Sequence, residues 1–105
     1  MSVNNYYQNR WYEGQKNPNG IVFVIYSGLS GNKFVGYTTN SVQKRFNQYW
    51  SDRFNSKTKL AKEMQAGNKD DFVVVVYKDV EGESDGRDTV RNITMWDSYI
   101  DVREK

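Results

Sequence analysis

The sequence contains no cysteine and no histidine, and it has one proline and two leucines among its 105 residues. Without cysteine there is no disulfide framework, no thiolate zinc site and no thiol nucleophile. Without histidine the chain lacks the commonest metal ligand and the side chain that normally titrates near neutral pH. Nucleophilic Ser–His and Cys–His pairs and the usual zinc hydrolase sites are therefore excluded. Any chemistry must use Tyr, Arg, Lys, Asp, Glu, Ser or Thr side chains.

Long apolar runs are also absent. The longest, Phe72–Tyr77, is far shorter than the roughly 20 residues that span a bilayer. The N-terminus shows neither the basic region nor the apolar stretch of a signal peptide. Mean hydropathy is −0.88, while three Trp, eight Tyr and five Phe supply large side chains for a core. These features predict one domain that is cytoplasmic and has no membrane partner.

Basic residues concentrate in the first two thirds of the chain. Residues 1–66 contain nine Lys/Arg and three Asp/Glu, a net charge of +6, whereas residues 67–105 contain six Lys/Arg and ten Asp/Glu, a net charge of −4. The segment from Lys33 to Lys62 has seven basic residues and one acid, Asp52. Such a segment is either a solvated basic face or a surface that binds a polyanion.

The residue patterning predicts strands and helices in the order β-β-α-α-β-α. β-branched and aromatic runs indicate the strands, apolar residues at helical spacing indicate the helices, and an acidic, glycine-containing stretch indicates a loop. Asn40 or Ser41 is expected to cap the first helix and Ser56 the second. The expected elements are strands at 21–27, 33–38 and 72–77, helices at 42–50, 60–66 and 90–100, a hairpin loop at 28–32 and an acidic loop at 81–88.

This order predicts an α+β fold with a three-stranded antiparallel sheet flanked by helices. The third strand, 72–77, is apolar without alternation, so it is expected to be buried on both faces and central in the sheet. Residues 1–20 are polar and aromatic and end in a turn, Asn17-Pro-Asn-Gly. We therefore interpret them as an N-terminal arm that precedes a single domain at 21–105.

Two aromatic triplets carry a family resemblance. Ile21-Val-Phe23 and Phe34-Val-Gly36 place Phe23 and Phe34 eleven residues apart, and Thr38, Asn40 and a helical Arg45 follow. With the element order, this pattern resembles the GIY-YIG nuclease family over about residues 20–102. The resemblance is strongest to small phage-encoded endonucleases, which share an aromatic pair after the arginine, here Tyr49-Trp50. It would place the protein in a host cytoplasm.

The resemblance implies metal-assisted phosphodiester hydrolysis. In that family a Tyr hydroxyl helps to activate water, an Arg stabilises the phosphate charge and a Glu on the last helix holds a divalent cation such as Mg²⁺. Arg45 carries over directly, because a guanidinium suits phosphate recognition. Further candidate phosphate contacts are Lys44, Lys57, Lys59 and Thr38, and candidate aromatic contacts to bases are Tyr49, Trp50 and Trp11.

The other motif positions depart from the family. Phe23 and Phe34 replace the two tyrosines and have no hydroxyl. Tyr26 and Tyr37 are candidate catalytic substitutes, but each lies at an odd offset from its phenylalanine and is expected on the opposite sheet face. The position four residues before Ile100, where the glutamate is expected, is Trp96, and Asp97 beside it points about 100° away on a helix.

Two hypotheses follow from these departures. The favoured one is a catalytically impaired, regulatory or inhibitory member that binds nucleic acid or a nucleotide through Arg45 and the basic face, without a cofactor. The alternative is an active endonuclease that uses Tyr37, with Asp97 or an acidic-loop residue holding Mg²⁺. A further alternative is a protein-binding inhibitor on the same scaffold, because the site and not the fold decides function.

Overall fold

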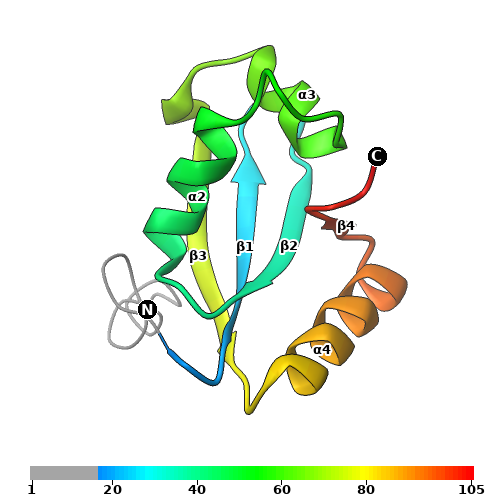
Figure 1. Ribbon diagram of the computed structural model, residues 1–105. Coiled ribbons are helices and arrows are strands. Elements are labelled where there is room, and N and C mark those ends of the chain that lie inside the picture. Colours follow the sequence, from blue (N-terminus) through cyan, green and yellow to red (C-terminus); the bar gives the residue numbers. More distant parts are fainter. Residues whose placement is uncertain (1–16) are drawn as a thin grey trace, which may run out of the picture.

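The computed structural model describes residues 17–105, and in that part of the chain a sheet of four strands lies between helices on both faces (Figure 1). The predicted α+β class is confirmed. None of the helices in this part is long and apolar enough to cross a membrane. The elements are β1 (Ile21–Ser27), β2 (Lys33–Thr38), α2 (Val42–Ser51), α3 (Lys59–Gln65), η1 (Lys69–Asp71), β3 (Phe72–Asp79), α4 (Glu83–Trp96) and β4 (Ile100–Asp101).

The sheet is mixed, so the predicted three-stranded antiparallel sheet is wrong in strand number and direction. The strand order is β3-β1-β2-β4; β1 pairs antiparallel with β2 and β3, and β4 runs parallel to β2. The apolar spacing predicts Ile100 on the last helix, but α4 ends at Trp96 and the chain turns at Ser98, whose φ is 60°. Ile100 then pairs with Phe34 in a strand of two residues, too short to show a pattern.

The central position belongs to β1 and not to β3, which is an edge strand of this sheet. All five residues of Ile21–Ile25 are fully buried, whereas Val73 of β3 is 57% exposed. An apolar run without alternation therefore predicted a strand correctly but did not tell an edge strand from a central one.

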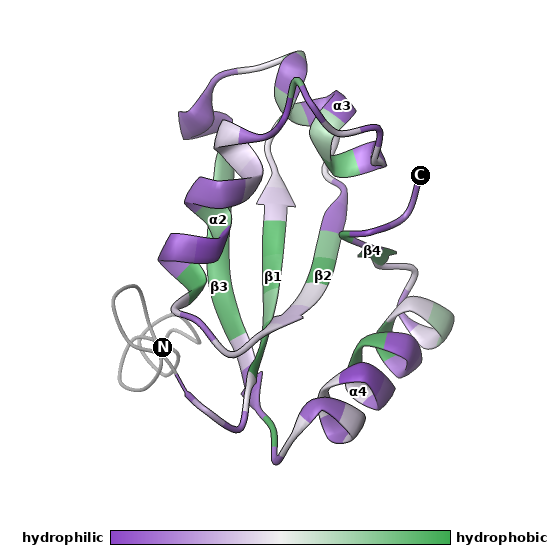
Figure 2. Ribbon diagram, in the orientation of Figure 1, coloured by the Kyte–Doolittle hydropathy of each residue, from purple (hydrophilic) through white to green (hydrophobic). Residues whose placement is uncertain are grey.

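Alternation along β1 divides the core between two faces. Ile21, Phe23 and Ile25 pack toward α2 and α3, whereas Val22 and Val24 pack toward α4. Figure 2 shows the hydrophobic colour concentrated in the strands, with hydrophilic residues prominent on both long helices. The sheet therefore has α2 and α3 on one face and α4 on the other, and candidate site residues come from both sides.

Helix starts follow local hydrogen bonding. Ser41 accepts from the Lys44 N–H at 3.2 Å and caps α2, and Thr58 in place of the predicted Ser56 accepts from the Ala61 N–H at 3.1 Å and caps α3. The predicted acidic loop at 81–88 is mostly the first half of α4, because Glu83 and Asp85 lie in its first turn, where the helix dipole favours negative charge.

Candidate functional site

Two hollows share a wall made of Arg45 and Tyr49. A groove of about 640 Å³ runs between α2, α3 and the C-terminal residues, and a pocket of about 60 Å³ lies at the edge of β2. The groove is also lined by Gln48, Asp52, Asn55, Ser56, Lys57, Thr58, Leu60, Ala61, Met64 and Lys105. The pocket is also lined by Gly36, Tyr37, Arg87, Val90, Asp101, Val102 and Arg103.

The pocket exists because β4 pairs with only part of β2. The ladder joins β4 to Phe34 and Val35, and the Val102 N–H donates to the Val35 carbonyl at 3.0 Å. The next β2 residue is Gly36, and a Cβ there would lie 2.6 Å from Cζ of Phe23 and 2.8 Å from Cγ2 of Val102. The motif glycine is therefore required by the close approach of these two side chains beneath the pocket.

Arg45 stands on the second turn of α2, as the sequence predicts. Its guanidinium lies 4.5 Å from the Tyr49 ring centre, and Nη1 donates to the Gln48 side chain at 2.9 Å. The Tyr49 ring in turn packs 6.2 Å from that of Phe23. Burial raises the pKa of Tyr49, although the charge and hydrogen bond of Arg45 oppose the change. Tyr49 is therefore a protonated hydroxyl at neutral pH.

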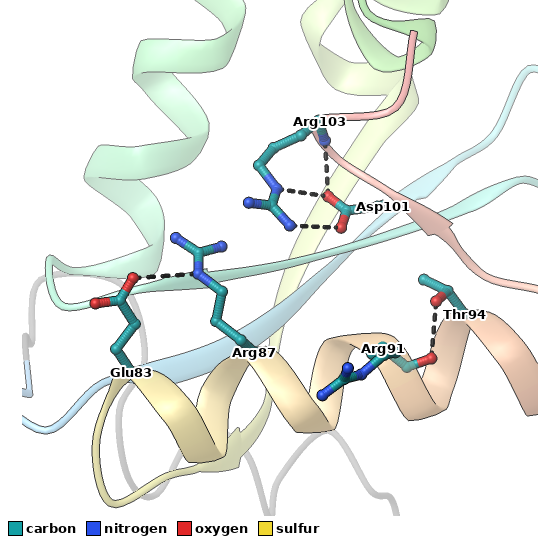
Figure 3. A network of polar contacts seen from close by, with 6 residues as sticks. All are labelled: Glu83, Arg87, Arg91, Thr94, Asp101 and Arg103. Atoms are coloured by element: carbon teal, nitrogen blue, oxygen red, sulfur yellow. Dashed lines mark hydrogen bonds and ion pairs between the residues drawn. The ribbon is translucent and has the colours of Figure 1, made fainter.

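Asp101 and Arg103 form the C-terminal wall of the pocket. Nε and Nη2 of Arg103 donate to the two carboxylate oxygens of Asp101 at 3.2 and 3.1 Å, and the Arg103 N–H donates to Oδ1 at 2.8 Å (Figure 3). Burial alone would raise the pKa of Asp101, but these hydrogen bonds and the charges of Arg103 and Arg87 lower it below its ordinary value. Asp101 is therefore ionised, and both of its carboxylate oxygens accept hydrogen bonds from Arg103.

Tyr37 is seated between two glycines. A Cβ on Gly20 would lie 2.1 Å from the Tyr37 ring, and one on Gly86 would lie 2.2 Å from it. The Tyr37 hydroxyl lies 3.5 Å from the carbonyl oxygen of Asn19, and the Arg87 guanidinium lies 5.7 Å from the ring centre. Sequence reasoning missed Gly86 because it placed residues 81–88 in a loop, where a glycine is common.

The remaining tyrosine candidate lies elsewhere. Tyr26 is on the opposite face from Phe23, as its odd offset predicts, and it lines neither hollow. Burial raises its pKa, with Tyr99 adding to the effect. Phe23 and Phe34 are both fully buried in the core beneath α2 and α3. Of the two substitutes, Tyr37 is the one that the structure brings to Arg45.

The candidate phosphate-binding residues differ in whether they line either hollow. Lys57 lines the groove, whereas Lys59 is bonded to Glu104 at 2.6 Å and Lys44 is exposed on α2 outside both hollows. The Thr38 hydroxyl accepts from the Asn40 N–H at 3.0 Å, so both residues shape the turn into α2.

The candidate aromatic contacts also differ in whether they line either hollow. Tyr49 lines both hollows. Trp50 packs against Phe72, the guanidinium of Arg53 lies 3.8 Å from its ring centre, and it lines neither hollow. Trp11 lies outside the described residues, as does most of the predicted N-terminal arm.

Carboxylates are scarce at this site. Trp96 is the last residue of α4 and 77% exposed, and Asp97 is its C-cap, so the helix end stands away from both hollows. The α4 residues that do line the pocket are Arg87 and Val90. No group of three or more potential metal ligands occurs within residues 17–105. One carboxylate held by Arg103 among three guanidiniums does not fit a hard divalent cation, which needs several oxygen ligands.

Comparison with known proteins agrees with the geometry. The model of the GIY-YIG catalytic domain family matches residues 19–89, which include β1, β2, β3, the arginine helix α2, α3 and the start of α4 but not β4. No curated protein and no solved structure gives a significant match. The family match covers well over half of the chain. The protein therefore belongs to the GIY-YIG catalytic domain family.

Proposed function

We propose that this protein is a catalytically impaired GIY-YIG domain that binds nucleic acid through its phosphates and acts as a regulatory or inhibitory factor. The family gives a nuclease-like, nucleic-acid-related function as its starting point. The observation that carries the proposal is the composition of the Arg45 site. It combines arginines and the partly buried Tyr49 with two fully buried phenylalanines at the motif positions.

The groove suits a segment of nucleic acid. Its volume of about 640 Å³ lies within the usual range of ligand sites, about 300–1,000 Å³. Three cationic side chains, Arg45, Lys57 and Lys105, line it together with one acid, Asp52. Arginine and lysine contacts to phosphate oxygens supply most of the affinity in non-specific nucleic-acid binding.

Hydrolysis needs groups that this site does not bring together. A general base must be deprotonated at working pH, but the raised pKa of Tyr49 keeps its hydroxyl protonated. Tyr37 directs its hydroxyl toward the Asn19 carbonyl. On α4, Arg87 and Val90 line the pocket where a carboxylate would be needed. A fixed positive charge can stabilise a bound phosphate, but it does not activate water.

Arg45→Ala tests the proposal, with Arg91→Ala as the matched control. Arg91 is an exposed arginine on α4, paired with Asp88 and outside both hollows. In fluorescence anisotropy with labelled single-stranded and duplex DNA, we expect Arg45→Ala to weaken binding about tenfold or more, because a charge-assisted phosphate contact is worth about 1.5–3 kcal/mol. Affinity of the unchanged protein should fall steeply between about 50 and 200 mM salt.

Incubation of plasmid and single-stranded DNA with Mg²⁺, Mn²⁺ or EDTA completes the test. Binding without cutting is the expected result. Metal-dependent cutting that is lost in Arg45→Ala and kept in Arg91→Ala would overturn the proposed impairment and support an active endonuclease. Absence of binding to any nucleic acid would reject the binding role itself and leave the protein-binding alternative.

A further inference from the structure

The small pocket at the β2 edge is ringed by guanidiniums from three separate elements. Arg45 comes from α2, Arg87 from α4 and Arg103 from the segment after β4. Asp101 bonds Arg103, and Glu83 bonds Arg87 at 3.2 Å. The Arg87 and Arg103 side chains remain 43% and 61% exposed, so each can still meet a ligand. Three arginines brought together from distant parts of the chain favour an anion with several oxygens.

The size of the pocket limits the ligand. Its volume of about 60 Å³ is small beside that of the adjoining groove, at about 640 Å³. A pocket of this size suits a single small anionic group such as a phosphate. The nucleoside must therefore lie outside, and the adjoining groove of about 640 Å³ offers the space.

The wall that the two hollows share determines how one ligand could occupy both of them. Arg45 and Tyr49 line both, so a strand lying in the groove reaches the pocket by passing these two side chains. Tyr37 and Val90, from β2 and α4, stand among the other walls of the pocket. Figure 3 shows Arg87 rising from α4 toward the side where Asp101 and Arg103 stand. A strand that leaves the groove past Arg45 and Tyr49 therefore comes next to the side chains that line the pocket.

We infer that the pocket binds the terminal phosphate of a nucleic-acid strand whose last nucleotides lie in the groove. This inference rests on the proposed nucleic-acid binding and specifies its ligand as a phosphorylated end. A terminal phosphate carries nearly two negative charges at neutral pH and three free oxygens. An internal phosphodiester carries one negative charge. Three arginines against one carboxylate in a small pocket favour the more highly charged end over the interior of a strand.

Anisotropy with labelled single-stranded DNA of about 12 nucleotides, within the usual span of single-strand sites, tests the inference. The same sequence is prepared with a 5′-phosphate, a 3′-phosphate or hydroxyls at both ends, and the label is placed at the opposite end from the phosphate. We expect one phosphorylated form to bind about tenfold more tightly than the hydroxyl form, since hydrogen bonds to charged groups contribute about 1.5–3 kcal/mol. Which end is preferred identifies the polarity of the strand in the groove.

Arg87→Gln and Arg103→Gln should each bring the ratio of the two affinities close to one, whereas the control Arg91→Gln should keep it. Arg87→Lys, which retains the charge, should keep part of the preference. Circular dichroism confirms that each variant is folded. Equal affinity for phosphorylated and hydroxyl ends would overturn the inference while leaving the proposed binding intact. Absence of binding to every form would overturn both.

Discussion

The two faces of the sheet differ in packing and in charge. Toward α2 and α3, β1 presents Ile21, Phe23 and Ile25, and large aromatic rings fill that side of the core. Toward α4, it presents Val22 and Val24, which pack with other small branched side chains. The segment 42–65 carries six basic and two acidic residues, whereas α4 carries two basic and three acidic residues. The bulkier face is thus also the cationic one.

This difference explains where the site lies. The Phe23 ring packs against that of Tyr49, and the Tyr49 ring lies beside the Arg45 guanidinium, so the aromatic core is continuous with the wall that the two hollows share. The valine face contributes to the site only at its border, through Tyr37, Arg87 and Val90. A ligand is therefore expected on the α2–α3 side and at the β2 edge, and not over the outer face of α4.

Truncation of one core residue on each face gives the largest expected effects. Phe23→Ala should lower the free energy of unfolding by about 3–5 kcal/mol, because it empties a fully buried aromatic position. Val24→Ala, its fully buried neighbour on the other face, removes less volume and should cost about 2 kcal/mol. Urea denaturation measures both. A larger loss for Val24→Ala would contradict the expectation that the bulkier side chain of the α2–α3 face contributes more to stability.

The sequence predicted the fold class, the hairpin and the arginine helix because these depend on local signals. β-branched runs, a glycine loop and a serine cap act within a few residues. The sheet order and the strand β4 depend on tertiary contacts. The end of α4 at Trp96 follows from a turn at Ser98, a serine at positive φ that no spacing rule anticipates.

The site was predicted in part for the same reason. Arg45 and Tyr49 lie one helical turn apart, so sequence spacing alone places them together. Arg87, Asp101 and Arg103 reach the pocket only because α4 and β4 fold back along β2. Their sequence distance from Arg45 gave no indication of this contact. The position of Asp97 at the end of α4 follows from the same helix boundary.

Gly86→Ala tests how closely the α4 face is fitted to Tyr37. An alanine stabilises an exposed helix by about 1 kcal/mol relative to glycine, but here its Cβ would lie 2.2 Å from the Tyr37 ring. Overpacking of this kind costs about 1–3 kcal/mol, so we expect net destabilisation of about 1 kcal/mol by thermal or urea unfolding. Asn92→Ala, at an exposed position of the same helix, is the control. A more stable Gly86→Ala would contradict the close contact.

Asp101→Asn tests the border between the faces and should give the smallest effect. Because hydrogen bonds and charge from Arg103 outweigh burial, the pKa of Asp101 is lower in the folded chain than its unfolded value of about 3.9. The stability that it contributes is therefore complete above that value and is lost as pH falls through the lower folded pKa.

At pH 6.5 the variant should be less stable than the unchanged protein by at most about 1 kcal/mol, as for an ion pair that is partly exposed. Urea unfolding at pH 6.5 and near pH 3 should show this difference shrinking at the lower pH. A difference that grew on acidification would mean that Asp101 is held in its neutral form. The same substitution removes the negative charge from the pocket, so affinity for a phosphorylated DNA end should rise while stability falls. That opposition separates a residue that shapes an anion site from one that only stabilises the fold.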